Sequence, residues 1–214
     1  MRIRIKFVKQ GALRYTGHLD LHKLWERAAR RAELPLAYSQ GFHPQPKMSM
    51  AAALPLGFSS RCEVMDMKLE RDISLDDLPT RLNKTLPAGL QVVDVEQVEE
   101  RAPALQTQVV SAEYEVTLTE SIDRSDLKQK IDSIIESIAL PRERRGKMYD
   151  LRPLIEELSL LPVSLPKGEA QEIKIFMRLT AREGATGRPE EVLDVLGIAF
   201  EETRIERTYL IFQS

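Results

Sequence analysis

The sequence contains few of the residues that build disulfide, redox or metal sites. Cys62 is the only cysteine among 214 residues, which excludes a disulfide within the chain and leaves an iron–sulfur cluster or a cysteine-rich zinc site without enough ligands. A reducing cytoplasm is the simplest compartment for such a chain. No segment approaches the roughly 20 apolar residues of a membrane helix, and the N-terminus lacks the apolar region of a signal peptide. We therefore expect a cytoplasmic protein that has no contact with a membrane.

The sequence also lacks a large excess of either positively or negatively charged residues. The formal net charge is -2, so the chain as a whole does not attract nucleic acid over long range. A local basic patch is compatible with this total. The composition, 43% hydrophobic and 30% charged, is typical of a folded protein, and the length allows one large or two small domains.

Hydrophobic periodicity predicts a similar order of elements in each half of the chain. Alternating apolar residues predict half-buried strands at residues 3–7, 63–69, 114–118, 173–179 and 205–212, with further strands at 48–53 and 90–98. Helical spacing predicts helices that begin at Thr16 or Gly17, at Ser74, near 127 and at Pro189. Their buried stripes are Leu21, Leu24, Trp25, Ala28 and Ala32; Leu75, Leu78, Leu82 and Leu86; Leu127, Ile131, Ile134, Ile135 and Ile138; and Val192, Leu193 and Leu196.

This order predicts an α+β fold of two ferredoxin-like βαββαβ units in tandem, in which antiparallel sheets carry helices on one face. The first unit spans residues 1–99, a linker 100–108 and the second unit 109–214. The opposite sheet face is predicted to be polar in both units. It carries Arg2, Arg4, Lys6 and Lys68 in the first, and Glu113 and Glu115 opposite Lys174 and Arg178 in the second. Residues 148–161 are compatible with either strand or helix.

The stretch from Tyr38 to Ser60 is the most distinctive part of the sequence. Glycine and proline at Gly41, Pro44 and Pro46 predict a shaped loop, which leads into an apolar run of small residues. Polar donors within a rigid loop are typical of a functional surface. We expect this loop to form a binding site together with the start of the first helix. The predicted binding residues are Arg14, Thr16, His18, Asp20, Tyr38, Ser39, Gln40, Gly41, His43 and Lys47.

The start of the first helix leaves several kinds of chemistry open. His18 and His22 lie four residues apart on one helix face, a spacing that can hold a metal, but no third ligand is evident and we predict no metal and no cofactor. Free backbone N–H groups at the helix start favour an anion, which Asp20 would repel. A small hydrolase or transferase that uses His18, Asp20 and His43 is a further alternative. No complete catalytic set is present, so we assign no catalytic residue.

A basic segment in the second half suggests a contact with RNA. It contains Arg142, Arg144, Arg145, Lys147 and Arg152 with Tyr149 among them, and basic residues interleaved with an aromatic suit nucleic acid. Glu143 and Asp150 dilute its charge. The exposed sheet face of the first unit offers no paired aromatic residues on which bases could stack.

Three stretches carry a resemblance to a known family: TGHLDLHKLWERAARRAELPLAYSQGFHPQPKMSMAAALPLGFSS, GKMYDLRPLI and GRPEEVLDVLG. Together they resemble the bacterial radical SAM-linked protein family, a domain of unknown function. The HLDL helix start, the AYSQGFHP loop and the LPLGFSS turn carry most of the likeness, and all three lie in the predicted first unit. Members occur beside, or fused to, a cobalamin-binding radical SAM enzyme.

The resemblance implies an accessory or substrate-binding partner of such an enzyme, carried on a separate chain, and not an independent enzyme. This chain lacks a cysteine triplet, so it would not itself cleave S-adenosylmethionine. The alternative is a protein that binds or modifies RNA through its basic surface.

Overall fold

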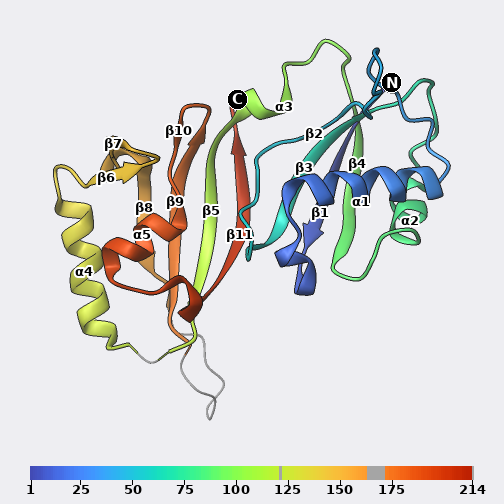
Figure 1. Ribbon diagram of the computed structural model, residues 1–214. Helices are drawn as coiled ribbons and strands as arrows, with labels where there is room; N and C mark the ends of the chain where they lie inside the picture. The colour runs from blue at the N-terminus through green and yellow to red at the C-terminus, as the bar shows by residue number, and fades with distance from the viewer. Residues whose placement is uncertain (121, 163–171, 214) are drawn as a thin grey trace. The chain divides into compact units, whose positions relative to one another are not determined.

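The computed structural model describes residues 1–120, 122–162 and 172–213. The chain divides into two compact units, Met1–Val109 with Gln213, and Val110–Phe212 (Figure 1). Each unit combines an antiparallel sheet with a few helices, so the predicted α+β class is confirmed. The predicted limits of the domains and linker stay predictions. No helix in the described ranges is long and apolar enough to cross a membrane.

The first unit places its strands in the order β2-β3-β1-β4, and each neighbouring pair is antiparallel. β4 lies at the edge of this order, and its bounds are those that the sequence predicts. The elements are β1 (Arg2–Lys9), η1 (Gly11–Tyr15), α1 (His18–Arg31), β2 (Met48–Met50), β3 (Ser59–Lys68), α2 (Leu78–Asn83), β4 (Leu90–Val98) and α3 (Leu105–Gln108).

The core of the first unit lies between the sheet and two helices. Alternation in β1 and β3 sends every second side chain to the same face, where α1 and α2 contribute their apolar stripes, and Figure 1 shows α1 crossing in front of the strands. These buried residues include Ile3, Ile5, Phe7, Met65, Met67, Leu21, Trp25, Leu78 and Leu82. The rings of Phe7 and Trp25 meet edge to face, with centroids 4.8 Å apart.

The second helix begins later than the sequence predicts. Ser74 does not cap it, because the Ser74 hydroxyl accepts a hydrogen bond from the backbone N–H of Asp76 at 3.2 Å and forms a local turn. α2 starts at Leu78 after Asp77 and ends at Asn83, so only Leu78 and Leu82 of the predicted stripe are helical.

One side chain protects the free edge of β4. Asn83, the last residue of α2, accepts from the backbone N–H of Val92 at 2.7 Å and donates to its carbonyl at 3.1 Å. An amide side chain therefore occupies both backbone groups of Val92, as a neighbouring strand would.

The second unit has a similar strand order. β8 and β5 both pair with β9 in antiparallel register, and β11 lies next to β5. The elements are β5 (Val109–Leu118), α4 (Arg124–Glu136), β6 (Pro141–Arg144), β7 (Lys147–Asp150), η2 (Arg152–Leu154), β8 (Ile155–Leu160), β9 (Lys174–Arg182), β10 (Ala185–Thr186), α5 (Pro189–Leu196), η3 (Phe200–Glu202) and β11 (Thr203–Phe212). The question left open by residues 148–161 is therefore resolved as two strands joined by a short 3-10 turn.

The predicted stripe of α4 is only partly buried. Leu127, Ile131 and Ile134 are buried, whereas Ile135 is exposed and Ile138 is fully exposed. The helix ends at Glu136, because Ser137 takes an extended backbone and its hydroxyl donates to the carbonyl of Ile134 at 2.6 Å. Ile138 thus lies beyond the helix, so its spacing from Ile134 does not place it on the buried face.

Candidate functional site

The loop from Ser39 to Lys47 is fixed at its base and open at its tip. The backbone N–H of Ser39 donates to the Gln45 carbonyl and that of Lys47 to the Ala37 carbonyl, both at 2.8 Å. The Ser39 hydroxyl accepts from the Gln45 N–H at 2.9 Å. Gly41 takes a φ of +129°, a conformation that favours glycine. The rigid loop predicted by the sequence is therefore present.

The loop base lies against the C-terminal half of α1. The Tyr38 hydroxyl accepts from Arg30 Nε at 3.0 Å and donates to Glu26 at 3.4 Å. Glu26 follows His18 by eight residues, which is about 12 Å along a helix axis. In the described ranges, no hydrogen bond or ion pair joins Gln40 or His43 to the helix start. The predicted binding residues thus form two groups, and their joint action stays a prediction.

The start of α1 is held by backbone contacts. Gly17 is the N-cap residue and offers no side chain, while Lys9 Nζ donates to the Thr16 carbonyl at 3.0 Å. The rings of His18 and His22 meet with centroids 4.8 Å apart. Burial lowers the pKa of His22, and the charge of His18 lowers it further. Neutral imidazole is therefore favoured at His22.

Three exposed apolar side chains surround this helix start. Tyr15, Leu19 and Leu56 are 61%, 75% and 60% exposed and belong to η1, α1 and the turn before β3. The Gly57 N–H donates to the Arg14 carbonyl at 2.8 Å, which ties that turn to η1. We call Tyr15, Leu19 and Leu56 the α1-start patch. Sequence reasoning missed the patch, because nothing in LPLG indicates that Leu56 faces solvent.

Arg14 is part of the same surface. Its guanidinium lies 4.7 Å from the centroid of the Tyr15 ring and donates to the Tyr15 hydroxyl at 2.7 Å. This stacking restrains the Tyr15 ring. The ring would therefore lose less side-chain entropy when another molecule binds to it. Arg14 is one of the predicted binding residues, and the structure places its guanidinium over the Tyr15 ring.

The basic segment forms the β6–β7 hairpin. Arg145 and Gly146 both take positive φ, 54° and 76°, as a two-residue hairpin turn requires. Arg144 is bound to Glu191 and also donates to the Thr186 carbonyl at 3.0 Å. Its guanidinium lies 4.7 Å from the Tyr149 ring centroid.

Two further arginines of this segment are also bound within the second unit. Arg142 pairs with Asp194 of α5 at 3.2 Å, and Arg152 donates to the carbonyls of Ile135 and Ile155 at 2.8 and 3.0 Å. Arg145 and Lys147 are exposed at the hairpin tip and have no ion pair with any residue in the described ranges. The cluster is thus mostly internal structure, and two of its cations face solvent.

The polar sheet faces are neutralised by acids. In the first unit, Asp66 accepts from Arg2 Nε at 3.0 Å and from Arg4 Nε at 2.8 Å. Arg2 also donates to the carbonyls of Ala102 and Pro103, at 2.7 and 3.0 Å, and so anchors the predicted linker. Lys6 and Lys68 pair with Asp94 and Glu100, each at 2.9 Å.

The second unit shows the predicted cross-strand charge pairs. Arg178 of β9 lies opposite Glu113 of β5 and donates to it at 2.8 Å. Lys174 approaches Glu115 at 3.9 Å. Arg178 therefore lies directly opposite Glu113, whereas Lys174 lies opposite Thr117 and reaches Glu115 diagonally. Across the described part of the chain, no group of three or more His, Cys, Asp or Glu residues could hold a metal ion.

A family model matches residues 2–189 and is described as an uncharacterized protein conserved in bacteria, DUF2344. This chain belongs to that family. The expected bacterial domain of unknown function is therefore confirmed, while the link to a radical SAM enzyme stays a prediction. No curated protein matches the sequence.

Solved structures match at low identity. A Cbf5-Nop10-Gar1 complex matches with a TM-score of 0.51 and 10% identity, over 97% of this chain and 48% of that chain. An archaeal box H/ACA sRNP Nop10-Cbf5 complex matches with a TM-score of 0.47 and 11% identity, over 98% and 48%. This chain spans about half the length of those chains. The first match shows a likeness of fold alone.

Proposed function

We propose that this protein is a cytoplasmic accessory protein that binds a cobalamin-dependent radical SAM enzyme carried on a separate chain. The α1-start patch carries the proposal. Isolated exposed apolar residues are ordinary on a protein surface. Three from separate elements, one of them a tyrosine stacked against an arginine, are typical of a protein-binding surface. The choice of partner rests on the resemblance of the HLDL, YSQGFHP and LPLGFSS motifs, which surround this patch in the sequence.

The rigid loop from Ser39 to Lys47 supplies a second part of the proposed contact. Phe42 at its tip is fully exposed, and Gln40 and His43 beside it are exposed as well. A loop whose base is hydrogen-bonded loses little entropy when its tip binds. We propose that the patch and the loop tip contact the enzyme or its substrate as two separate regions.

The proposal includes the finer fold, in which each unit is a ferredoxin-like βαββαβ unit. Support comes from the strand order, since β2-β3-β1-β4 and β8-β9-β5-β11 place corresponding strands in corresponding positions. The β6–β7 hairpin is then an insertion between the first helix and the second strand of the second unit.

Affinity capture from native bacterial lysate tests the proposed partner. The immobilised wild-type chain should enrich a protein that carries cobalamin and an iron–sulfur cluster, identified by mass spectrometry and absorption spectra. The double variant Leu19→Gln, Leu56→Gln should lose at least tenfold of this enrichment. Val93→Gln is the matched control, because Val93 is also 60% exposed but lies on β4.

Two outcomes contradict the proposal in different ways. If the wild-type chain never enriches a radical SAM or cobalamin protein, the partner is wrong. If the double variant captures that protein as well as the Val93 control does, the patch is wrong and the partner stands.

RNA binding is the second proposal, and the two solvent-facing cations of the β6–β7 hairpin favour it. Arg145→Ala with Lys147→Ala should weaken RNA retention and reduce the slope of log K against log salt by about 1.4, at about 0.7 per phosphate contact on a single strand. Retention and salt slope measured by filter binding would be unchanged if the hairpin tip does not contact RNA. Exposed Lys23→Ala and Arg27→Ala in α1 serve as the charge-matched control.

A further inference from the structure

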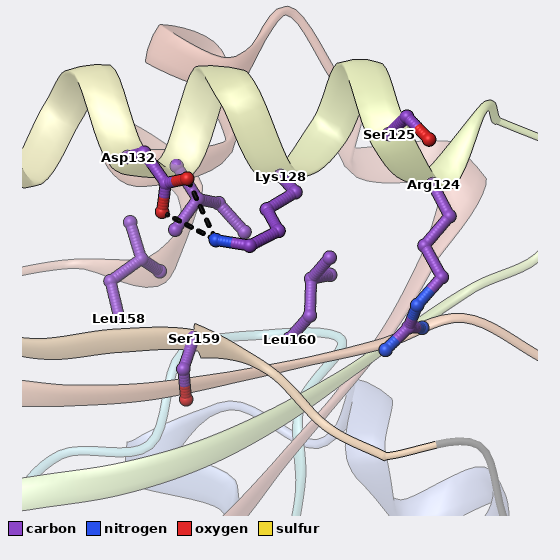
Figure 2. Close-up of a pocket in the computed structure, with 8 residues that line it drawn as sticks. Arg124, Ser125, Lys128, Asp132, Leu158, Ser159 and Leu160 are labelled. Carbon is purple, nitrogen blue, oxygen red and sulfur yellow. Dashed lines mark hydrogen bonds and ion pairs between the residues drawn. The ribbon is translucent and has the colours of Figure 1, made fainter.

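A cavity lies between α4 and β8 in the second unit, away from every residue used above for partner or RNA binding. Its volume is about 450 Å³, within the roughly 300–1,000 Å³ of small-molecule sites. Figure 2 shows Arg124 reaching from α4 towards the strands, whereas Lys128 turns along the helix to Asp132. Arg124, Lys128 and Asp132 follow one another at intervals of four and therefore share one face of the helix.

Arg124 is held in place with one donor unused. Its Nη2 donates to the Leu161 carbonyl at 2.8 Å, while Nη1 is buried and has no hydrogen-bond partner within the described part of the chain. A buried donor without a partner is costly. Arg124 lines the cavity, but Nη1 has almost no accessible surface, so an acceptor in the cavity would reach it only after the guanidinium rotates. An anionic acceptor would then form the stronger, charge-assisted bond.

The other charged groups set the charge that the cavity would accept. Lys128 Nζ binds both carboxylate oxygens of Asp132, at 3.0 and 2.7 Å. This pair is neutral as a unit, so Arg124 leaves one positive charge in excess. Asp123 already caps α4 by accepting from the N–H groups of Ser125 and Asp126 at 2.8 and 3.0 Å. The positive character of the cavity therefore comes from side chains and not from the helix end.

The remaining wall is apolar. Leu158 and Leu160 point from β8 towards α4, and Ser159 between them points to the other side of the strand (Figure 2), as strand alternation requires. Buried Ile131 of α4 completes this wall. An occupant would thus meet one cationic side chain, Arg124, and an apolar surface beside it.

We propose that the α4–β8 cavity binds a small organic anion, a carboxylate or phosphate group on an apolar body, with Arg124 as the residue that binds the anionic group. Leu158, Leu160 and Ile131 contact the apolar body. This site is independent of the proposed partner surface, and its failure leaves that proposal untouched.

Calorimetric titration of the full chain with four probes tests the proposal. Benzoate and phenyl phosphate should bind saturably, and the tighter of the two identifies carboxylate or phosphate as the preferred group. Benzyl alcohol, which lacks the charge, and inorganic phosphate, which lacks the apolar body, should each bind at least tenfold more weakly. The backbone N–H signals of Ser125 and Lys128 should shift in NMR spectra during titration with the tighter probe.

Two variants separate the site from a general charge effect. Arg124→Gln should weaken binding at least tenfold, and Arg182→Gln should not, since Arg182 is an exposed arginine of the same unit without an ion pair in the described ranges. Leu160→Trp keeps Arg124 and fills the cavity, so it should also abolish binding even if Arg124→Gln fails to fold. Three results would overturn the proposal: no saturable binding by either anionic probe up to about 10 mM, equal binding of benzyl alcohol, or unchanged binding in folded Arg124→Gln or in Leu160→Trp.

Discussion

The polar faces of the two units carry similar ion pairs in different surroundings. Asp66 in the first unit is only 3% exposed and accepts from two arginines, whereas the side chain of Glu113 in the second keeps 19% of its exposure and accepts from Arg178. A charge that loses its partner is costly when water cannot reach it and inexpensive when water can. Access of water, and not the number of ion pairs, therefore decides how much each unit depends on them.

The largest effect should follow from Asp66→Asn. Removing this charge leaves the buried guanidinium of Arg2 and the partly buried one of Arg4 without a carboxylate, which should cost about 3–5 kcal/mol in the free energy of unfolding. Urea unfolding followed by circular dichroism measures this cost. Asp94→Asn is the control, because Asp94 pairs with exposed Lys6. A similar cost for both variants would contradict the comparison.

A smaller effect should follow from Arg144→Gln. Arg144 connects the β6–β7 hairpin to Glu191 of α5 and to the Thr186 carbonyl, and hydrogen bonds of charged groups contribute about 1.5–3 kcal/mol. Thermal unfolding should register this loss, and Arg145→Gln at the hairpin tip should leave the melting temperature unchanged. If the two variants melted alike, the assignment of Arg144 to internal structure would be wrong.

The next effect depends on pH and concerns Glu190 in the first turn of α5. Burial raises the pKa of Glu190, although nearby Arg188 opposes the shift. A raised folded-state pKa means that the folded form prefers the protonated acid. The contribution of Glu190 to stability is therefore complete below its pKa in the unfolded state, about 4.3. This contribution is lost as the pH rises through the pKa of Glu190 in the folded state.

Glu190→Gln cannot ionise and should remove this dependence. The variant should melt close to the wild type at pH 4 and above it at pH 7.5, as measured by differential scanning fluorimetry in matched buffers. Exposed Glu183→Gln, on the same unit, controls for the change in net charge. An equal difference between the Glu190 variant and the wild type at both pH values would show that ionisation is not the cause.

The smallest effect should follow from Glu113→Gln. Its pair with Arg178 is reached by water, and Arg178 also pairs with Glu157 at 3.0 Å, so the change should cost at most about 1 kcal/mol. The same urea titration that detects the Asp66 variant provides the measurement. A cost as large as that of Asp66→Asn would mean that burial does not explain the difference between the units.

Elements with a strong local period were predictable from sequence. The alternation of Ile3, Ile5 and Phe7 gave β1, and the signals at Pro87 and Gly89 placed the start of β4 correctly. α2 was misplaced because Ser74 suits a helix cap and a local turn equally well, and only the folded backbone decides between them.

The candidate site was less predictable because its residues interact with distant parts of the chain. The basic segment reads as a cationic surface, yet Glu191 and Asp194, which bind Arg144 and Arg142, follow about 50 residues later. Tyr38 is one of the predicted binding residues, and the sequence did not indicate that its hydroxyl bonds to Glu26 and Arg30. Local composition cannot show which charges meet in space.

The amide of Asn83 affects whether two copies of the protein can pair through their sheet edges at high concentration. A foreign chain that approached the outer side of β4 at Val92 would first have to break two hydrogen bonds, and only then could it form its own. At Val92 the edge of the sheet therefore offers no unpaired backbone N–H or carbonyl to another strand. A single side chain thus opposes edge-to-edge pairing with another molecule, the first step of aggregation through a sheet edge.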